Sequence, residues 1–425
     1  MWLTMEVDQP IEASPVRTSR LDGPRIFLYS HDTYGLGHFR RNLLLARAIA
    51  RGIPDASVLC ATGSPRSHSF PLPPNFDYLK LPSTTKDGKG GYRARTLGLT
   101  LPEIARLRAR LLREAMISFR PDLVLVDHAP LGMEGELRPA LRALRRRFPS
   151  TGAVLGLRDI VDAADRVRAS WSRPAVRNVL EDLYDRILVY GSAKVFDLPR
   201  EYGFSPRVRA KTRFVGYLAP DPVPAPPERT RAALGLGRLP VVLVIVGGGG
   251  DGAPLLRTYI RALDEGAAPG FESVLVTGPL LSAEKRARIR ASATGRARVR
   301  LLDFAANVPD LVRAADVVVS MAGYNATCEI LWTGTKSILV PRTQPRLEQQ
   351  IRAMRLAALG LVRALPPDDL SPARLREEVE RALAAPRPPG PCPLEFQGAE
   401  EAVSEFRSLL RRPVPAAVSG NGRHG

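Results

Sequence analysis

Short apolar runs alternate with segments of helical periodicity along most of the chain. Apolar runs of strand length occur in the first half at 25–30, 56–61, 122–127, 153–157, 186–190 and 213–217. Between the first two runs, residues 38–50 place leucine, isoleucine and alanine at helical spacing. Strands that are apolar throughout are typical of a parallel sheet buried on both faces. The first half therefore predicts an α/β domain with a doubly wound parallel sheet.

The same pattern restarts after a proline-rich break. Residues 219–227 (APDPVPAPP) hold five prolines in nine positions, which neither a helix nor a central strand tolerates. Further apolar runs follow at 240–246, 273–277, 298–302, 316–320 and 337–341. The fold class expected is therefore α/β, with two Rossmann-like doubly wound domains that face a central cleft.

This pattern also sets the expected domain boundaries. We expect a disordered leader at 1–23, an N-terminal acceptor domain at 24–217, a linker at 218–228, a C-terminal nucleotide-binding domain at 229–397, a helix at 398–412 that packs back on the N-terminal domain, and a disordered tail at 413–425.

Composition and charge restrict the class of protein. The net charge is +19, and 55 of the 62 basic residues are arginine, a bias typical of GC-rich coding. The arginines are dispersed through predicted helices and aromatic residues make up only 6%, so a nucleic-acid partner is not predicted. Three widely spaced cysteines and the lack of a signal peptide or a long apolar stretch predict a cytoplasmic protein. Peripheral contact with an anionic membrane at its inner face stays open.

The first apolar run ends in a turn that carries a histidine. Residues 31–38 read HDTYGLGH, and Gly35 and Gly37 would let a ligand approach the backbone. A dinucleotide fingerprint would need a third glycine where Arg40 stands, so NAD and FAD are not predicted. His38 would lie at a helix N-terminus, where the dipole favours the neutral imidazole that a general base needs. Whether His38 is a base or only packs at the turn stays open.

A second glycine-rich turn follows the run at 240–246. It consists of Gly248, Gly249, Gly250 and Gly252 within GGGGDGA. The turn lacks the Lys-Ser/Thr of a P-loop. Bare backbone N–H groups ahead of a helix bind anions, so a diphosphate is the expected ligand.

Polar residues follow several other strands. In the C-terminal half, Gly323 turns the chain after the run at 316–320, and Glu329 follows on the next helix. A carboxylate there can accept two hydrogen bonds from a ribose diol. Gln349 and Gln350 begin a later helix, and their amides suit sugar hydroxyls.

The N-terminal half has four polar residues at two strand ends. These acceptor-site candidates are Asp127, His128, Arg158 and Asp159. Ligands of open α/β sheets bind beyond the carboxyl ends of the strands. Asp127 is also a candidate base, or a cap of the following turn.

The stretch from Phe304 to Ala353 resembles the C-terminal domain of the MurG-like glycosyltransferase family 28, and the turn at 247–253 resembles the diphosphate loop of that family. The resemblance implies the GT-B fold and a UDP-sugar donor. It implies that Phe304 and Ala305 meet the uracil, Glu329 the ribose, Gly248 to Gly252 the diphosphate, and Gln349 and Gln350 the sugar. It places His38 on the acceptor side.

These observations lead to one functional hypothesis and two alternatives. We expect an inverting hexosyltransferase that moves a hexose or N-acetylhexosamine from a UDP-sugar to a hydroxyl acceptor, either lipid-linked or a small molecule. The chain contains no D-x-D triplet, so neither a metal nor a cofactor is expected. The alternatives are a sugar-nucleotide epimerase or hydrolase of the same fold, and a non-catalytic basic binding protein with a degenerate site.

Overall fold

The computed structural model describes residues 23–31, 37–86, 91–248, 250–305, 307–387 and 392–411. The expected tail at 413–425 and all but the last residue of the expected leader at 1–23 lie outside the described residues.

The N-terminal domain is built on one parallel sheet of seven strands in the order β3-β2-β1-β6-β7-β8-β9. The strands are β1 (Arg25–Ser30), β2 (Ser57–Thr62), β3 (Phe76–Lys80), β6 (Leu123–Asp127), β7 (Gly152–Arg158), β8 (Arg186–Tyr190) and β9 (Thr212–Phe214). The helices are α1 (Gly37–Gly52), α2 (Leu101–Phe119), α3 (Arg138–Arg147), α4 (Ala164–Trp171), α5 (Pro174–Asp182), α6 (Leu198–Glu201) and α7 (Pro206–Ala210). A small antiparallel hairpin of β4 (Thr84–Lys86) and β5 (Tyr92–Ala94) lies outside the sheet.

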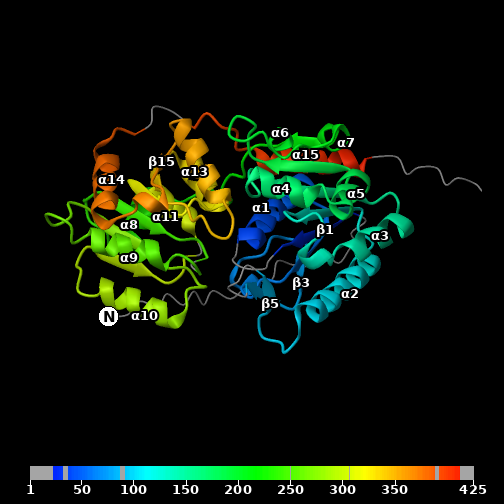
Figure 1. Ribbon diagram of the computed structural model, residues 1–425, viewed down its shortest axis with the longest axis horizontal. Coiled ribbons are helices and arrows are strands. Elements are labelled where there is room, and N and C mark those ends of the chain that lie inside the picture. Colours follow the sequence, from blue (N-terminus) through cyan, green and yellow to red (C-terminus); the bar gives the residue numbers. More distant parts are fainter. Residues whose placement is uncertain are drawn as a thin grey trace, which may run out of the picture.

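The C-terminal domain repeats this design with six parallel strands in the order β12-β11-β10-β13-β14-β15. The strands are β10 (Val241–Ile245), β11 (Glu272–Val276), β12 (Val299–Leu302), β13 (Val317–Ser320), β14 (Lys336–Leu339) and β15 (Arg363–Ala364). The helices are α8 (Pro227–Ala233), α9 (Ala253–Ala262), α10 (Ala283–Ala293), α11 (Val308–Ala314), α12 (Tyr324–Thr333), α13 (Glu348–Ala358) and α14 (Pro372–Ala384). Figure 1 shows the two domains side by side.

The expected fold class, two Rossmann-like domains, is confirmed by these two sheets. All five residues of β6 and all five of β10 are buried, because helices cover both faces of each sheet. Strand order reverses between β1 and β6 in one sheet and between β10 and β13 in the other. Loops that leave the carboxyl ends of strands at such a reversal diverge and leave a crevice. The fold therefore places two crevices against each other.

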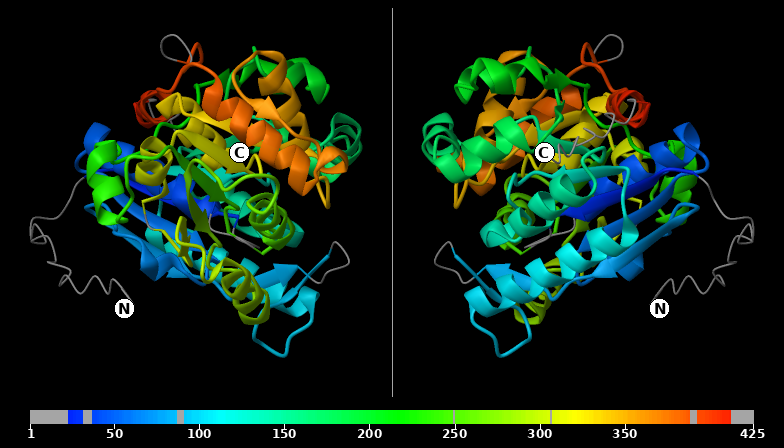
Figure 2. Two further views of the ribbon diagram at one scale, coloured as in Figure 1. Left: turned by 90° about the vertical axis from the view of Figure 1, so that its left-hand side faces the viewer. Right: turned by 90° about the vertical axis from the view of Figure 1, so that its right-hand side faces the viewer.

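The last helix, α15 (Gly398–Leu410), returns to the N-terminal domain. Figures 1 and 2 both show this red helix against the N-terminal domain, where it packs on α1. The backbone N–H of Gly398 donates to the Tyr217 carbonyl at 3.0 Å, and Arg407 Nε donates to the Gly52 carbonyl at 2.9 Å. Phe406 is fully buried in the core that α15 shares with α1.

Several elements differ from the expected ones. The sequence did not predict β3, β4, β5 and β15. Residues 76–80 (FDYLK) mix polar and apolar side chains because β3 is an edge strand. The expected strand at 213–217 ends at Phe214, and the expected linker at 218–228 overlaps α8, whose first turn begins at Pro227. Proline fits a first helical turn because no N–H is needed there.

A buried ion pair joins the two domains. Arg352 on α13 donates to Asp159, which follows β7, with Nη2 2.6 Å from Oδ1 and Nε 2.9 Å from Oδ2. The two side chains are 0% and 1% exposed. Arg352 Nη1 also donates to the Ala322 carbonyl at 2.9 Å, so the guanidinium connects α13, the end of β13 and the other domain.

Arg352→Met should lower the free energy of unfolding by about 3–5 kcal/mol, because it leaves the Asp159 carboxylate buried without its partner. Urea unfolding followed by circular dichroism measures the change. The control is Arg355→Met, which breaks the exposed pair between Arg355 and Glu201, 52% and 33% exposed, and should cost less than about 1 kcal/mol. Equal losses in the two variants would contradict the structural role given to the buried pair.

Candidate functional site

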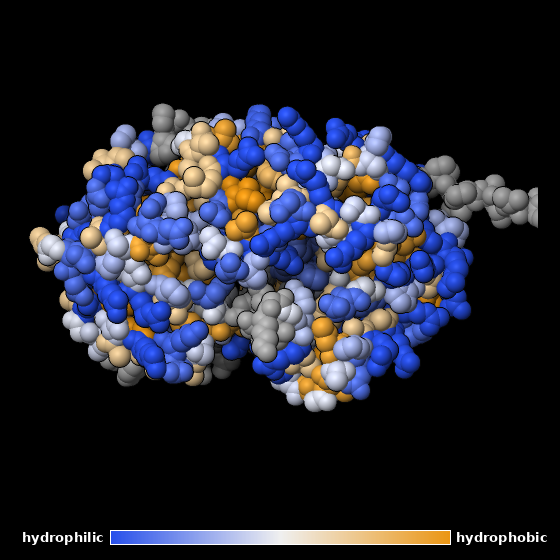
Figure 3. Space-filling view, in the orientation of Figure 1, coloured by the Kyte–Doolittle hydropathy of each residue, from blue (hydrophilic) through white to orange (hydrophobic). Residues whose placement is uncertain are grey.

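A cleft of about 240 Å³ lies between the two domains, where the carboxyl ends of both sheets meet. The space-filling view shows a hollow at this junction, on a face that is otherwise mainly hydrophilic (Figure 3). The lining comes from both domains. Among the predicted site residues it includes Gly37, His38 and Arg158 from the first domain, and Gly248, Gly250, Phe304, Ala305, Gly323, Glu329 and Gln349 from the second.

On the N-terminal side, the cleft presents an imidazole backed by a buried carboxylate. His38 Nδ1 lies 2.5 Å from Asp127 Oδ2. Arg41, one turn further along α1, donates from Nε and Nη2 to Asp127 Oδ1 at 2.8 and 2.6 Å. Asp127 is 2% exposed. Burial opposes its ionisation, but Arg41 and His38 outweigh burial and lower the pKa of Asp127 to about 2.

This arrangement fixes how His38 holds its proton. Asp127 is ionised at neutral pH and can only accept, so we infer that Nδ1 of His38 carries the hydrogen and Nε2 keeps a free lone pair. Arg41 Nη2 lies 2.9 Å from the same Nδ1. With the hydrogen on Nδ1, these two nitrogens are both donors, so their contact is a close approach and not a hydrogen bond. Burial lowers the pKa of His38, although Asp127 acts in the opposite direction. The imidazole is therefore neutral near pH 7 and can accept a proton.

The prediction that Asp127 might itself contact the acceptor does not agree with its placement. Asp127 does not line the cleft and lies behind His38. In this geometry its Oδ2 orients the imidazole, and Arg41 balances the charge of the carboxylate.

On the opposite side, the glycine-rich turn brings bare backbone to the cleft. Gly248 and Gly250 line it, and Gly247 has a φ of +63°. Gly278, with a φ of +79°, packs so closely on Gly248 that a side chain would collide with the backbone of Gly248. Helix α9 begins at Ala253, directly after the turn. Such a turn ahead of a helix can hold an anion on its N–H groups.

One predicted residue of the turn does not face the cleft, and another is not described. Gly252 is buried, and a side chain there would collide with Val246, so it serves packing. Gly249 lies outside the described residues.

Glu329 lies at the cleft on α12 and already has one partner. Arg40 Nη2, from the other domain, donates to Glu329 Oε1 at 2.6 Å. The second oxygen, Oε2, is buried and has no hydrogen-bond partner among the described residues. Burial raises the pKa of Glu329 and Arg40 opposes that rise. An unsatisfied buried acceptor is costly, so a ligand hydroxyl at Oε2 would relieve the cost.

Aromatic and amide groups complete the C-terminal side. Phe304 is 39% exposed at the mouth of the cleft, and its ring meets that of Phe70 from the other domain at 6.4 Å between centroids. Gln349 Oε1 accepts from the Arg342 backbone N–H at 3.2 Å, and the amide nitrogen, which has no hydrogen-bond partner in the part of the chain that the structure describes, could donate to a ligand. Gln350 does not line the cleft.

The remaining acceptor candidates are dispersed. Arg158 lines the cleft. His128 borders a second pocket of about 420 Å³ next to it. The carbonyl of Gly37 accepts from Asn325 of the other domain at 3.1 Å, and Gly35 lies outside the described residues. The prediction that Asp159 belongs to the acceptor site does not agree with its placement. Asp159 does not reach the cleft, because Arg352 occupies both of its oxygens.

Sequence reasoning missed three residues that shape the site. Arg41 binds Asp127 and Arg40 binds Glu329. The Tyr324 ring packs against the guanidinium groups of Arg41 and Arg352, whose central carbons lie 5.5 and 5.8 Å from its centroid. The spacing of three residues between His38 and Arg41, which puts both on one helix face, could have indicated Arg41. The contacts of Arg40 and Tyr324 cross between domains and leave no local signal.

Comparisons with known proteins match the C-terminal half of the chain to a family. Residues 242–400 match the glycosyltransferase family 28 C-terminal domain. The UDP-N-acetylglucosamine--N-acetylmuramyl-(pentapeptide) pyrophosphoryl-undecaprenol N-acetylglucosamine transferase of Symbiobacterium thermophilum is 29% identical over 275 residues, which cover 60% of this chain and 72% of that protein. Two further relatives of that name match over only 29% and 39% of their length.

Solved structures agree on the fold. The calicheamicin glycosyltransferase CalG4 has a TM-score of 0.59 at 18% identity, covering 93% of this chain and 100% of CalG4. A UDP-N-acetylglucosamine 2-epimerase has a TM-score of 0.59 at 12% identity, covering 93% and 99%. At these identities the likeness concerns the fold alone, so the chemistry must be argued from the site.

The pKa of His38 should lie below the ordinary value of 6.5, and Asp127→Asn should lower it further. The carboxylate is the group that stabilises the imidazolium, so its loss leaves the effect of burial unopposed. Titration of the imidazole signals by NMR measures both values, and with five histidines in the chain a His38→Gln variant assigns the signal. An unchanged or raised pKa in Asp127→Asn would contradict the proposed coupling.

Proposed function

We propose that this protein, a glycosyltransferase with the GT-B fold whose C-terminal domain belongs to glycosyltransferase family 28, transfers a hexose or N-acetylhexosamine from a UDP-sugar to a hydroxyl acceptor with inversion. The observation that carries the proposal is the placement of a neutral, carboxylate-backed His38 across one cleft from the glycine turn and Glu329.

The donor is proposed to lie against the C-terminal domain. Phe304 and Ala305 would contact the uracil, and Glu329 the ribose, whose diol can supply the donor that Oε2 lacks. Gly248 and Gly250 would hold the diphosphate through backbone N–H groups, and Gln349 would bind the sugar. A UDP-sugar is favoured because the name of the Symbiobacterium thermophilum relative gives UDP-N-acetylglucosamine.

The chemistry then follows from the two sides of the cleft. Nε2 of His38 takes the proton of the acceptor hydroxyl, and the oxygen attacks the anomeric carbon. The bond from that carbon to the UDP oxygen breaks, and UDP leaves with the electron pair. Asp127 stabilises the imidazolium that forms, and the N–H groups of the glycine turn stabilise the charge on the leaving diphosphate. We propose that this departure needs neither a metal nor a cofactor.

An epimerase or hydrolase is the weaker candidate, although an epimerase shares the fold. Such chemistry needs acid and base groups near the sugar. Of the described residues that line the cleft, only Asp251 and Glu329 are acidic, and each faces an arginine, Arg342 and Arg40 respectively. A protein that only binds its ligand would not need the neutral imidazole of His38 oriented by the buried Asp127 carboxylate.

The acceptor and the location of the protein remain proposals too. The printed name of the relative includes an undecaprenol-linked acceptor. None of the helices described here is long and apolar enough to cross a membrane. We propose a cytoplasmic enzyme that meets a lipid-linked or small-molecule acceptor, with its net charge of +19 favouring contact with an anionic inner membrane face.

The wild-type protein should bind UDP and hydrolyse a UDP-sugar slowly in excess EDTA. Glu329→Ala should weaken UDP binding by about 1–3 kcal/mol, because a ribose hydroxyl loses its acceptor. Calorimetric titration measures affinity, and chromatography of released UDP measures hydrolysis. Loss of all donor binding in EDTA would overturn the metal-independent proposal, and unchanged affinity in Glu329→Ala would remove Glu329 from the ribose site.

His38→Ala should leave UDP affinity close to the wild-type value while transfer falls on the order of 10²–10⁴-fold, the usual contribution of a general base. A panel of hydroxyl acceptors with a labelled UDP-sugar supplies the rate, and circular dichroism checks folding. Full transfer by the variant would place the base elsewhere. Equal loss of UDP binding and transfer would mean that His38 maintains the cleft rather than the chemistry.

A further inference from the structure

Two phenylalanine rings, one from each domain, meet at the mouth of the cleft. Phe304 follows β12 in the C-terminal domain, and Phe70 follows the short 3-10 helix η1 (Ser67–Ser69) in the N-terminal domain. Both side chains line the cleft. Their ring centroids lie 6.4 Å apart and their planes are inclined by 79°, which is an edge-to-face contact.

The Phe304 ring keeps much of its surface free although it touches Phe70. Phe304 is 39% exposed, which places it among the large apolar side chains that the protein leaves in contact with water. Gly248 and Gly250 of the glycine turn line the same cleft. Exposed apolar surface in a concave site that also offers polar backbone groups is typical of a ligand site. An exposed ring and an anion-binding turn in one cleft suit a ligand that carries both a planar base and a phosphate.

The Phe70 ring is supported from behind by the core of the N-terminal domain. Its centroid lies 5.9 Å from that of Phe39, which is fully buried on α1. The Phe39 ring in turn contacts Tyr78 of β3 at 6.2 Å between centroids. Phe70 is therefore packed against a fixed group of rings, while part of its surface still faces the cleft.

The first turn of α1 connects this aromatic contact to the rest of the site. Three consecutive residues lie there: His38 is the proposed general base, Phe39 supports Phe70, and Arg40 donates to Glu329 at 2.6 Å. A ligand that moves Phe70 thus acts on the same helical turn that carries the base.

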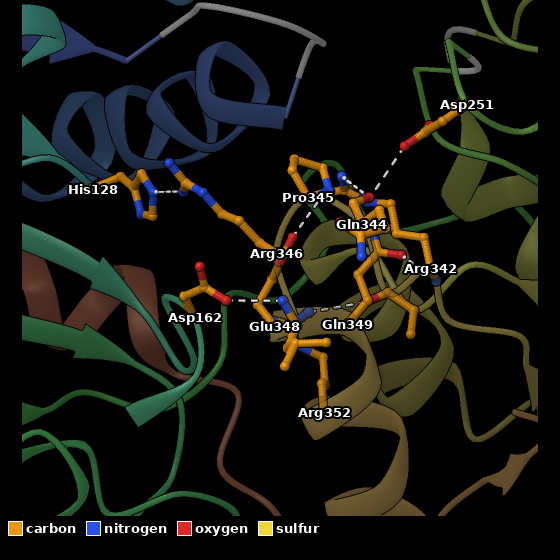
Figure 4. Close-up of polar contacts among 12 residues, drawn as sticks. His128, Asp162, Asp251, Arg342, Gln344, Pro345, Arg346, Glu348, Gln349 and Arg352 are labelled. Carbon is orange, nitrogen blue, oxygen red and sulfur yellow. Dashed lines mark hydrogen bonds and ion pairs between the residues drawn. The ribbon is translucent and has the colours of Figure 1, made fainter. Parts of the chain in front are cut away.

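Polar contacts between the domains lie elsewhere, at the loop before α13. Figure 4 shows the Arg346 side chain reaching from this loop toward His128 of the N-terminal domain. Arg346 Nη1 lies 2.9 Å from His128 Nε2, and the Leu347 N–H donates to Asp162 Oδ1 at 2.8 Å. Arg346, His128 and Asp162 line the second pocket, whereas the two phenylalanines line the cleft. The domains are thus joined by polar groups at a place separate from the aromatic contact.

The spacing of the two rings is close to the spacing that a stacked base requires. Carbon atoms in contact lie about 3.5–4.0 Å apart, so a planar base between two parallel rings separates them by about 7–8 Å. The rings are 6.4 Å apart in the ligand-free protein. An opening of about 1 Å, with a rotation of the Phe70 ring, would admit a base between them.

We propose that Phe70 is a nucleobase-binding residue, which covers the base of the donor nucleotide from the N-terminal domain while Phe304 supports the opposite face. This inference rests on the proposed function, which supplies the nucleotide. It adds the side chain by which the N-terminal domain recognises the donor. Because each domain contributes one ring, the bound base joins the two domains at the mouth of the cleft and sets the position of α1, and with it His38, relative to the donor.

The test is calorimetric titration of the full chain with UDP, uridine and inorganic pyrophosphate. Phe70→Ala should weaken the binding of UDP and of uridine at least about fivefold, the lower end of what stacking of a base on an aromatic ring contributes. Pyrophosphate has no base, so its affinity should stay unchanged. Phe70→Tyr keeps the ring and should bind UDP and uridine nearly as well as the wild-type protein.

Two further variants separate stacking from packing. Phe70→Leu keeps most of the apolar volume but has no ring, so it should lose uridine affinity as Phe70→Ala does, and it replaces that variant if circular dichroism shows that Phe70→Ala does not fold. Arg346→Met is the matched control, because it removes a different contact between the domains. It should leave the affinities for UDP and uridine within about twofold of the wild-type values, a difference of less than about 0.5 kcal/mol.

Unchanged uridine affinity in both Phe70→Ala and Phe70→Leu would overturn the proposal. So would an equal loss of uridine affinity in Arg346→Met, because Phe70 would then act only by holding the domains together. Failure of the donor hypothesis looks different: the wild-type protein itself would bind neither UDP nor uridine, and the role given to Phe70 would fall with that hypothesis.

Discussion

The buried ion pair between Asp159 and Arg352 fixes how the two domains face each other. A carboxylate and a guanidinium that are both removed from water must keep their mutual hydrogen bonds, because separation would leave two buried charges without compensation. The pair therefore restricts the C-terminal domain to orientations in which α13 stays against the end of β7. Every other contact across the cleft, including that of Arg40 with Glu329 and of Arg346 with His128, depends on this orientation.

Within that constraint, the two halves of the cleft supply different chemistry. The N-terminal side supplies titratable side chains, since His38 lies at the start of α1 with Asp127 and Arg41 behind it. The C-terminal side supplies mainly backbone, amide and aromatic groups around the turn at 247–252 and the start of α12. A reaction that needs proton removal on one partner and stabilisation of a departing anion on the other fits this division. The fold achieves this division because the carboxyl ends of two separate sheets face each other across the cleft, so no single loop has to supply both sets of groups.

The apolar pattern predicted most of this fold because both central sheets are buried on both faces, so that their strands read as continuous apolar runs. It missed β3, which lies at an edge, and β15, which has only two residues. The glycine turn, His38 and Glu329 could be located because turns and strand ends leave local signals. The partners of Glu329 and Asp159 could not, since each contact joins residues far apart in sequence. Asp159 was therefore assigned to the acceptor, although the fold uses it to hold the domains together.

The return of α15 makes the N-terminal domain discontinuous in sequence. Its core includes Phe406 and Ala402, which pack with residues of α1, although the whole C-terminal domain lies between them in the chain. During synthesis on the ribosome, α1 thus lacks part of its cover until α15, which follows the whole C-terminal domain, has been made. The chain also passes between the domains twice, near Tyr217 and again before Gly398, and the two crossings are bonded to each other there. Rotation of one domain about the first crossing alone would break these hydrogen bonds, so the double connection resists twisting about the linker.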